Sequence, residues 1–304
     1  MPITEVEKIW MNGELVDWAD ARVHLLTHAL HYGSGVFEGV RAYGTGRGTH
    51  VFRLQDHIAR LMRSAKIYMM DVPFSPEQLI QATKDVIKAN GLESCYIRPI
   101  VYRGYGEMGL FPLKAPVDVA IAVWPWGTYL GDEGIEHGIR AKISSFRRFG
   151  PNSMPPAAKA TGQYINSSLA KVEAVKAGYE EAILLDDQGN LSEGTGENLF
   201  VVRAGVVATP PAPCDVLEGI TADTVAAICR NEDIPLERRV MVRSDLYVAD
   251  EAFLTGTAAE IVPLREVDDR VIGEPGPVTK QIQETFYSII KGENDKYGDF
   301  LEWI

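Results

Sequence analysis

The sequence predicts two domains of mixed helices and strands, the first α+β and the second α/β. The 304 residues are enough for two hydrophobic cores. Segments rich in β-branched and aromatic residues alternate with segments whose apolar residues recur at helical spacing, and a stretch with three glycines at 127–134 interrupts them. We therefore expect an N-terminal α+β domain at 1–127, an interdomain linker at 128–136, and a C-terminal α/β domain with a curved, barrel-like sheet at 137–304.

The first domain begins with a predicted β-hairpin. Strands at 8–11 and 14–16 flank Asn12 and Gly13, the two residues that most readily adopt the positive φ angles of a tight turn. Further strands, rich in β-branched and aromatic residues, are expected at 36–43, 50–52, 94–103 and 117–124, the last of them apolar enough to be central in its sheet.

Two helices are predicted in the same domain. Apolar residues at helical spacing indicate a helix at 54–68, which carries His57 and Arg60 one turn apart. A second helix follows Ser75, because a first-turn proline and a capping-box glutamine come next, and Asn90-Gly91 supplies its stop.

The second domain alternates strands with helices. Strands are expected at 139–146, 181–185, 199–202, 206–209, 239–242 and 252–255, and helices near 163–177, 222–230 and 277–290.

Bulk composition excludes several classes of protein. The net charge of −12, with no basic cluster, argues against nucleic acid as a partner. No apolar run is long enough to cross a bilayer, so no membrane is expected either. The acidic start does not resemble an export signal, and three widely spaced cysteines form neither a disulfide framework nor a metal knuckle. We expect a cytoplasmic protein.

Common catalytic motifs are missing from the sequence. Gly33-Ser34-Gly35 is not a dinucleotide-binding fingerprint, because Glu38 stands where the third glycine is needed. The histidines show no HExxH pattern or paired metal-ligand spacing, so no metal site is expected, and there is no GxSxG nucleophile elbow. The remaining candidates are a lysine and two anion-binding turns.

Lys159 lies among small, uncharged residues at 155–162, where a cofactor could approach its amine. A lysine that forms a Schiff base needs burial or a nearby positive charge, and walls of proline and alanine would provide the burial. Most lysines are instead solvated surface charges. The local pattern alone leaves both interpretations open.

Two turns with glycine are candidate anion sites. Residues 217–221 run into a predicted helix, whose N-terminal amides suit a phosphate, with the Thr221 hydroxyl as a further donor. Thr221 as a simple helix cap is an equally good interpretation. Residues 256–259 follow a strand, and their amides could receive an anion or form an ordinary turn.

Tyr96 and Arg98 stand two apart in an expected strand, so their side chains lie on one face. An arginine buried at such a position requires a carboxylate partner. The alternative is a position at the edge of the sheet, with the guanidinium in water.

Together these segments resemble the fold-type IV pyridoxal-phosphate enzymes and, among them, the branched-chain amino acid aminotransferases. The resemblance covers nearly the whole chain and implies two domains with pyridoxal 5'-phosphate at their interface. The motifs that carry it are YGSGVFEGVR at 32–41, HIAR at 57–60, YIRP at 96–99, AK at 158–159, SEGTGEN at 192–198, LEGIT at 217–221 and GTAA at 256–259.

The resemblance implies a role for each cofactor-binding residue. Lys159 is the catalytic residue, which anchors the cofactor and moves the proton between the substrate α-carbon and the cofactor. Glu193 faces the pyridine nitrogen and keeps it protonated. The remaining cofactor-binding residues hold the phosphate and the ring: Arg60, Tyr164, Leu217, Gly219, Ile220, Thr221 and Thr257.

The resemblance also implies that leucine, isoleucine or valine donates its amino group to 2-oxoglutarate in a ping-pong reaction. Arg98 would meet the distal carboxylate of glutamate at the pocket rim. Tyr32 and Leu110 would come from a partner subunit, which implies a homodimer at least and allows a hexamer. The substrate-binding residues implied are Tyr32, Phe37, Gly39, Tyr96, Arg98, Leu110, Trp126, Thr257, Ala258 and Ala259.

Rival functions share this fold. They are a D-amino acid or (R)-amine aminotransferase and an aminodeoxychorismate lyase, which eliminates instead of transferring, and Tyr96 and Arg98 argue against all three. A protein that carries pyridoxal phosphate without catalysis would keep Lys159 and the phosphate site but would need no substrate pocket.

Overall fold

The computed structural model describes residues 3–127 and 132–304. The chain forms two compact units, which consist of Met1–Gly127, Ala158–Gly162 and Ile289–Ile304 in the first, and Thr128–Ala157 and Gln163–Ser288 in the second. This division differs from the expected domain at 137–304, because two of its segments pair with the first unit. Ala160 forms a β-bridge with Val36, and strand β17 (Leu301–Trp303) pairs with a strand of the first sheet.

The expected linker at 128–136 contains part of a helix. Residues 128–131 lie outside the described residues, and helix α4 (Asp132–His137) occupies the rest.

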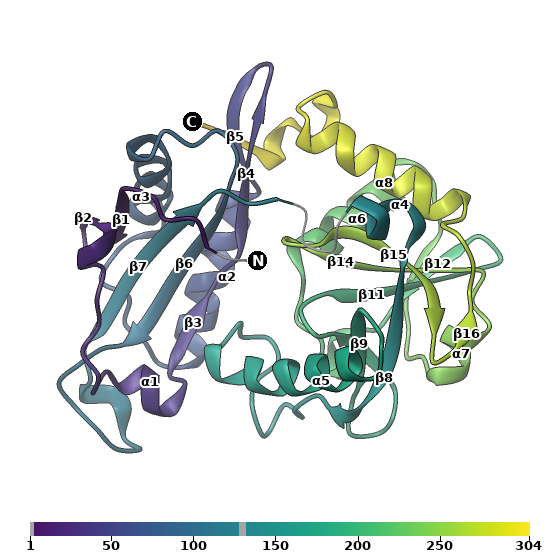
Figure 1. Ribbon diagram of the computed structural model, residues 1–304, viewed down its shortest axis with the longest axis horizontal. Coiled ribbons are helices and arrows are strands. Elements are labelled where there is room, and N and C mark those ends of the chain that lie inside the picture. The colour runs from purple at the N-terminus through teal and green to yellow at the C-terminus, as the bar shows by residue number, and fades with distance from the viewer. Residues whose placement is uncertain (1–2, 128–131) are drawn as a thin grey trace. The chain divides into compact units, whose positions relative to one another are not determined.

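The strands of the first unit form one sheet in the order β17-β5-β4-β6-β7-β1-β2, with β3 paired to β6 (Figure 1). The predicted hairpin turns on Asn12 and Gly13, both with positive φ, and β7 is central as expected. The strand expected at 36–43 is wrong as a single element, because the chain leaves the ladder at Glu38-Gly39. The strands are β1 (Lys8–Met11), β2 (Glu14–Asp17), β3 (Gly35–Phe37), β4 (Val40–Thr45), β5 (Gly48–Phe52), β6 (Cys95–Arg103) and β7 (Val117–Trp124).

Helices α2 (Leu54–Ile67) and α3 (Pro76–Ala89) share one hydrophobic core with this sheet. Burial of each large aliphatic side chain there contributes about 1.5 to 3 kcal/mol to folding. The predicted capping box is confirmed, since the Gln78 amide donates to Ser75 Oγ at 3.3 Å and the Ser75 amide donates to Gln78 Oε1 at 2.8 Å. A short helix, α1 (His28–Tyr32), precedes β3.

The strands of the second unit pair in the order β10-β9-β8-β15-β14-β11-β12-β13, with β16 on β15 (Figure 1). Because β10 also pairs with β11, the strands from β10 to β11 form a closed ring, whose closing pair is Glu193 and Asn198. The strands are β8 (Ile139–Arg147), β9 (Glu181–Leu185), β10 (Leu191–Gly194), β11 (Asn198–Arg203), β12 (Val206–Thr209), β13 (Leu236–Arg238), β14 (Glu251–Gly256), β15 (Glu260–Val267) and β16 (Arg270–Val271).

One strand expected in this unit is wrong. The segment 239–242 is not a strand, because β13 ends before it and Val242 becomes the N-cap residue of α7. The helices of the unit are α4, α5 (Tyr164–Lys176), α6 (Ile220–Asn231), α7 (Arg243–Tyr247) and α8 (Pro277–Ile290). Among the described residues, no helix is long and apolar enough to span a membrane.

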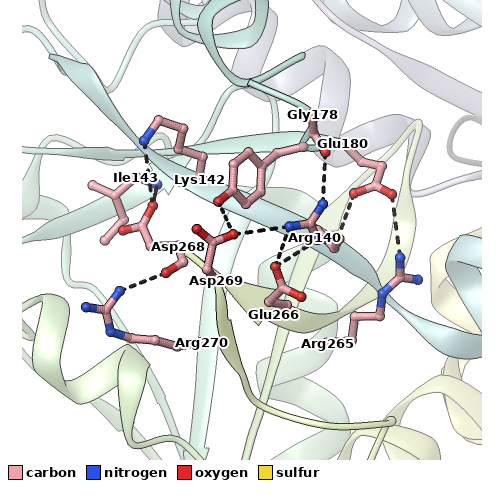
Figure 2. Close-up of polar contacts among 11 residues, drawn as sticks. Arg140, Lys142, Ile143, Gly178, Glu180, Arg265, Glu266, Asp268, Asp269 and Arg270 are labelled. Carbon is pink, nitrogen blue, oxygen red and sulfur yellow. Dashed lines mark hydrogen bonds and ion pairs between the residues drawn. The ribbon is translucent and has the colours of Figure 1, made fainter. Parts of the chain in front are cut away.

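A network of charged side chains ties β8 to the β15–β16 turn in the second unit (Figure 2). Arg140 lies 2.7 Å from Glu266 and 3.2 Å from Asp269, and it donates to the Gly178 carbonyl at 3.1 Å. Asp269 also accepts a hydrogen bond from the Tyr179 hydroxyl at 2.7 Å. One arginine thus joins two strands and the loop before β9.

Candidate functional site

Lys159 is held between helix α2 and strand β3 through its backbone. Its amide donates to Ser64 Oγ at 3.1 Å, and its carbonyl accepts from the Phe37 amide at 3.0 Å. Its side chain is half-buried, with Nζ 5.1 Å from the centre of the Phe37 ring. The local sequence pattern allows a solvated surface lysine. In the structure, the amine instead lies beside the aromatic ring of Phe37.

Arg60 belongs to a buried polar triad in the same unit. Its Nε and Nη2 donate to the two carboxylate oxygens of Glu38, each at 2.7 Å, and His57 Nδ1 lies 2.7 Å from Glu38 Oε2. Burial opposes ionisation of Glu38, but the Arg60 charge and the hydrogen bonds from Arg60 and His57 hold its pKa far below the usual range. The pKa of His57 is lowered by burial, against the effect of Glu38. Arg60 is therefore a fixed cation.

Tyr96 and Arg98 lie on one face of β6, as predicted. Strand β6 is flanked by β4 and β7, so the alternative of an arginine at a sheet edge is wrong. The Arg98 guanidinium lies 4.7 Å from the Phe37 ring centre and donates to the Tyr96 hydroxyl at 3.2 Å. The Trp126 ring lies beside the Tyr96 ring at 4.7 Å between ring centres, with the two planes tilted by 36°. The Arg98 guanidinium therefore lies against the rings of Phe37 and Tyr96.

Gly39 lies beside this aromatic group. A Cβ at Gly39 would stand 2.0 Å from the Tyr96 hydroxyl oxygen, so only glycine permits the contact. By contrast, Tyr32 and Leu110 are 45% and 90% exposed. Neither side chain belongs to the buried aromatic group around Tyr96 in its own chain.

Glu193 is clamped by three donors in the second unit. Its Oε2 accepts from the Leu217 amide at 2.9 Å and from Asn198 Nδ2 at 3.3 Å, while Arg148 Nη2 lies 2.8 Å from Oε1. The Glu193 side chain is only 9% exposed. The clamp fixes a buried carboxylate in one orientation.

Helix α6 begins at the turn that is predicted to bind an anion. Gly219 is its N-cap, and Thr221 lies buried in the first turn, so the interpretation of Thr221 as the cap is wrong. A Cβ at Gly219 would lie 1.8 Å from Asn198 Oδ1, which explains the glycine. Asn198 is held in this position because its Nδ2 donates to the Leu217 carbonyl at 2.8 Å. The first amides of α6, at Ile220 and Thr221, therefore start a helix of twelve residues, whose dipole favours an anion.

The second predicted turn, Thr257 to Ala259, joins β14 to β15. Its flanking residues Gly256 and Glu260 pair directly, so the turn is tight. A Cβ at Gly256 would lie 3.2 Å from the Gly196 carbonyl, which brings the turn against the 192–198 hairpin. Tyr164, half-buried, begins α5 in the same unit.

Three further residues contact the predicted site residues, and the sequence alone implies no role for them: Glu38, Asn198 and Arg148. Glu38 and Asn198 stand inside the quoted motifs, and that membership was the available signal. Arg148 has no such signal, because its contact with Glu193 joins segments that are distant in the chain.

The fold, together with the residues around Lys159 in the first unit and those around Glu193 in the second, defines a class of enzyme. The profile of the amino-transferase class IV family matches residues 35–267, and the chain belongs to this family. The predicted resemblance and the predicted fold class, that of the fold-type IV enzymes, are confirmed.

Particular relatives are similar over almost the whole chain. The branched-chain-amino-acid aminotransferase of Escherichia coli (strain K12) is 48% identical over 302 residues, which cover 98% of this chain and 98% of that protein. The crystal structure of the branched-chain aminotransferase of the archaeon Thermoproteus uzoniensis with norvaline has a TM-score of 0.94 and 46% identity, covering 98% of this chain and 99% of that one. The branched-chain amino acid aminotransferase of Thermobaculum terrenum in its PLP form has a TM-score of 0.91 and 34% identity, covering 97% of each chain.

Proposed function

We propose that this enzyme transfers the amino group of L-leucine, L-isoleucine or L-valine to 2-oxoglutarate, with pyridoxal 5'-phosphate as its cofactor. The observation that carries the proposal is the 48% identity to a branched-chain-amino-acid aminotransferase over 98% of both chains. The geometry of the two units supports it.

The chemistry of the available side chains fits pyridoxal phosphate. An aldehyde needs an amine, a pyridinium nitrogen needs a carboxylate, and a phosphate needs a cation and amide donors. The first unit offers Lys159 and Arg60, and the second offers Glu193 and the N-terminus of α6 at Ile220 and Thr221. When bound, the cofactor supplies an electron sink for the negative charge that develops at the substrate α-carbon.

The chain's own residues would hold the cofactor and move protons. Lys159 Nζ would hold the cofactor and, as a free amine, would take the proton from the substrate α-carbon. Glu193 would accept a hydrogen bond from the protonated ring nitrogen and would thereby keep it cationic. Tyr164 would donate to the ring oxygen and Leu217 would pack on the ring. The residues that would bind the phosphate are Arg60, Gly219 with the α6 amides, Thr221 and Thr257.

The substrate pocket requires two kinds of surface. Phe37, Trp126 and Tyr164 form the apolar wall for an aliphatic side chain. Arg98 is half-buried, so it can meet the distal carboxylate of glutamate while water solvates it when leucine is bound. The α-carboxylate is received by Tyr96 and the Thr257-Ala258-Ala259 turn, and Gly39 gives room beside Tyr96.

We infer that a second copy of the chain completes this pocket with its Tyr32 and Leu110, as in a homodimer or a larger assembly. Leu110 is 90% exposed, and other large apolar side chains are exposed along the same two segments. Side chains of this kind are typical of an interface between subunits. The exposed residues concerned are Leu25, Leu30, Tyr32, Met108, Leu110 and Phe111.

We also infer a cytoplasmic location. Cys95, Cys214 and Cys229 are all buried as free thiols, which suits a reducing compartment.

The test is the visible absorption spectrum of the purified enzyme. L-Leucine should bleach the band of the bound cofactor, and 2-oxoglutarate added afterwards should restore it. D-Alanine is the control, and a response to D-alanine alone would favour a D-amino acid aminotransferase. A band that neither amino acid changes would indicate a carrier without transaminase activity, and pyruvate release from aminodeoxychorismate would indicate the lyase.

A further inference from the structure

Glu193 contacts Arg148, an arginine that is not among the residues proposed above to bind the cofactor. On the basis of the proposed function, we propose that Arg148 is a positioning residue. It fixes the Glu193 carboxylate and balances its charge, so that Glu193 can face the ring nitrogen of the cofactor.

Arg148 is itself held firmly. It follows the last residue of β8, its amide donates to the Leu185 carbonyl at 2.8 Å, and its side chain is only 6% exposed. Its Nε donates to the Asp215 carbonyl at 3.4 Å, while Nη2 lies 2.8 Å from Glu193 Oε1. The guanidinium therefore reaches Glu193 from a rigid backbone position.

The two oxygens of Glu193 have different neighbours. Oε2 accepts hydrogen bonds from two neutral donors, the Leu217 amide and Asn198 Nδ2, whereas Oε1 contacts the charged Arg148. A carboxylate held on both oxygens cannot rotate freely about its last bond. The pair of Oε1 and Arg148 thus sets the plane of the carboxylate, and with it the direction in which it accepts a hydrogen bond.

Arg148 also balances negative charge near Glu193. Acidic groups lie around this position, and burial, followed by the charges of Asp186 and Asp187, raises the pKa of Asp215 while Arg148 opposes the rise. The charge of Glu193 also raises the pKa of Asp215. Without Arg148, this buried carboxylate would lose a cation that lies 2.8 Å away, while the neighbouring carboxylates remain, and that change favours its protonation. A protonated Glu193 would no longer keep the ring nitrogen cationic.

The experiment compares Arg148→Met with Arg147→Met. Arg147 is the adjacent arginine, but it is exposed and donates to the backbone of Asp187 instead of contacting Glu193. We expect Arg148→Met to weaken cofactor binding and slow the half-reaction with L-leucine about 10- to 100-fold, the usual cost of removing a group that orients a ligating side chain. The pH dependence of the cofactor's absorption band should shift in the same variant. Arg147→Met should match the wild type.

Further variants keep the inference falsifiable. Glu193→Ala defines the full loss, and Arg148→Lys should recover part of it, because the positive charge returns. If Arg148→Met does not fold, Arg148→Gln serves in its place. Its amide keeps a hydrogen-bond donor in the site but removes the positive charge, so the half-reaction should still slow and the band should still shift. A folded Met or Gln variant with the wild-type half-reaction rate, cofactor affinity and band would overturn the inference. Failure of the wild type to react with L-leucine would instead overturn the proposed function.

Discussion

The carboxylate of Glu38 and the guanidinium of Arg60 form a two-point ion pair, with both hydrogen bonds at 2.7 Å and both side chains buried. This pair lets a cation stand in the core of the first unit. It also aims the guanidinium, because two parallel hydrogen bonds fix its plane.

Glu38→Gln should therefore destabilise the enzyme by about 3 to 5 kcal/mol, since it removes the carboxylate from a buried two-point ion pair. Urea unfolding measures the change. The matched control is Asp56→Asn, which breaks the Arg53–Asp56 pair, where Asp56 is half exposed. That control should lose less than about 1 kcal/mol, and equal losses in the two variants would contradict the prediction.

Arg98→Ala should raise KM for 2-oxoglutarate about 10- to 100-fold, because a hydrogen bond to a charged group contributes about 1.5 to 3 kcal/mol. The KM for L-leucine should change much less, since an aliphatic side chain gains nothing from the guanidinium. Steady-state kinetics with each substrate varied in turn gives the two values. Parallel increases in both KM values would rule out a pocket with two kinds of surface.

Glu197 makes the stability of the second unit depend on pH. Burial, and next the charge of Glu181, raise the pKa of Glu197 to about 8 from its ordinary value of 4.5. The folded protein thus holds a proton between these pH values that the unfolded chain releases. The stabilisation is complete below pH 4.5 and is lost as the pH rises through about 8.

Glu197→Gln removes this titration because the amide stays neutral. Relative to the variant, wild-type stability should fall as the pH rises across this window, by up to about 1.4 kcal/mol per pH unit. Urea unfolding of both proteins at several pH values tests this. Glu136→Gln, at an exposed position of α4, is the control and should follow the wild type. A Glu197→Gln curve parallel to the wild type would refute the prediction.

Arg140→Met should lower the urea midpoint at low salt, because the variant loses the contacts to Glu266 and Asp269 that Figure 2 shows. Dissolved ions screen such partly exposed pairs, so the difference from the wild type should shrink at high salt. Arg47→Met, which breaks a longer and more exposed pair with Asp295, should change the midpoint less. A difference that persists at high salt would point to lost packing instead.

Local chemistry made much of the fold predictable. The hairpin at Asn12-Gly13 and the capping box at Ser75 and Gln78 depend on residues that are adjacent in the chain, and both form as expected. The strand expected at 239–242 failed for a different reason. Its β-branched residues fit a strand, but the ladder with β12 takes Leu236 to Arg238 instead, and that choice depends on a distant partner.

The sequence by itself determined the family, the candidate lysine and the two candidate anion-binding turns, because each depends on a short run of residues with a characteristic chemistry. The tertiary structure alone decided that β10 and β11 close a ring at Glu193, that Glu38 holds Arg60, and that Arg148 holds Glu193. The tertiary structure also decided that the last strand, β17, pairs with β5 of the first sheet. The two ion pairs and the pairing of β17 join residues that are distant in the chain, so local composition and spacing do not predict them. Glu193 and Asn198 are close in sequence, but their pairing closes a ring only because the other strands of the unit complete it.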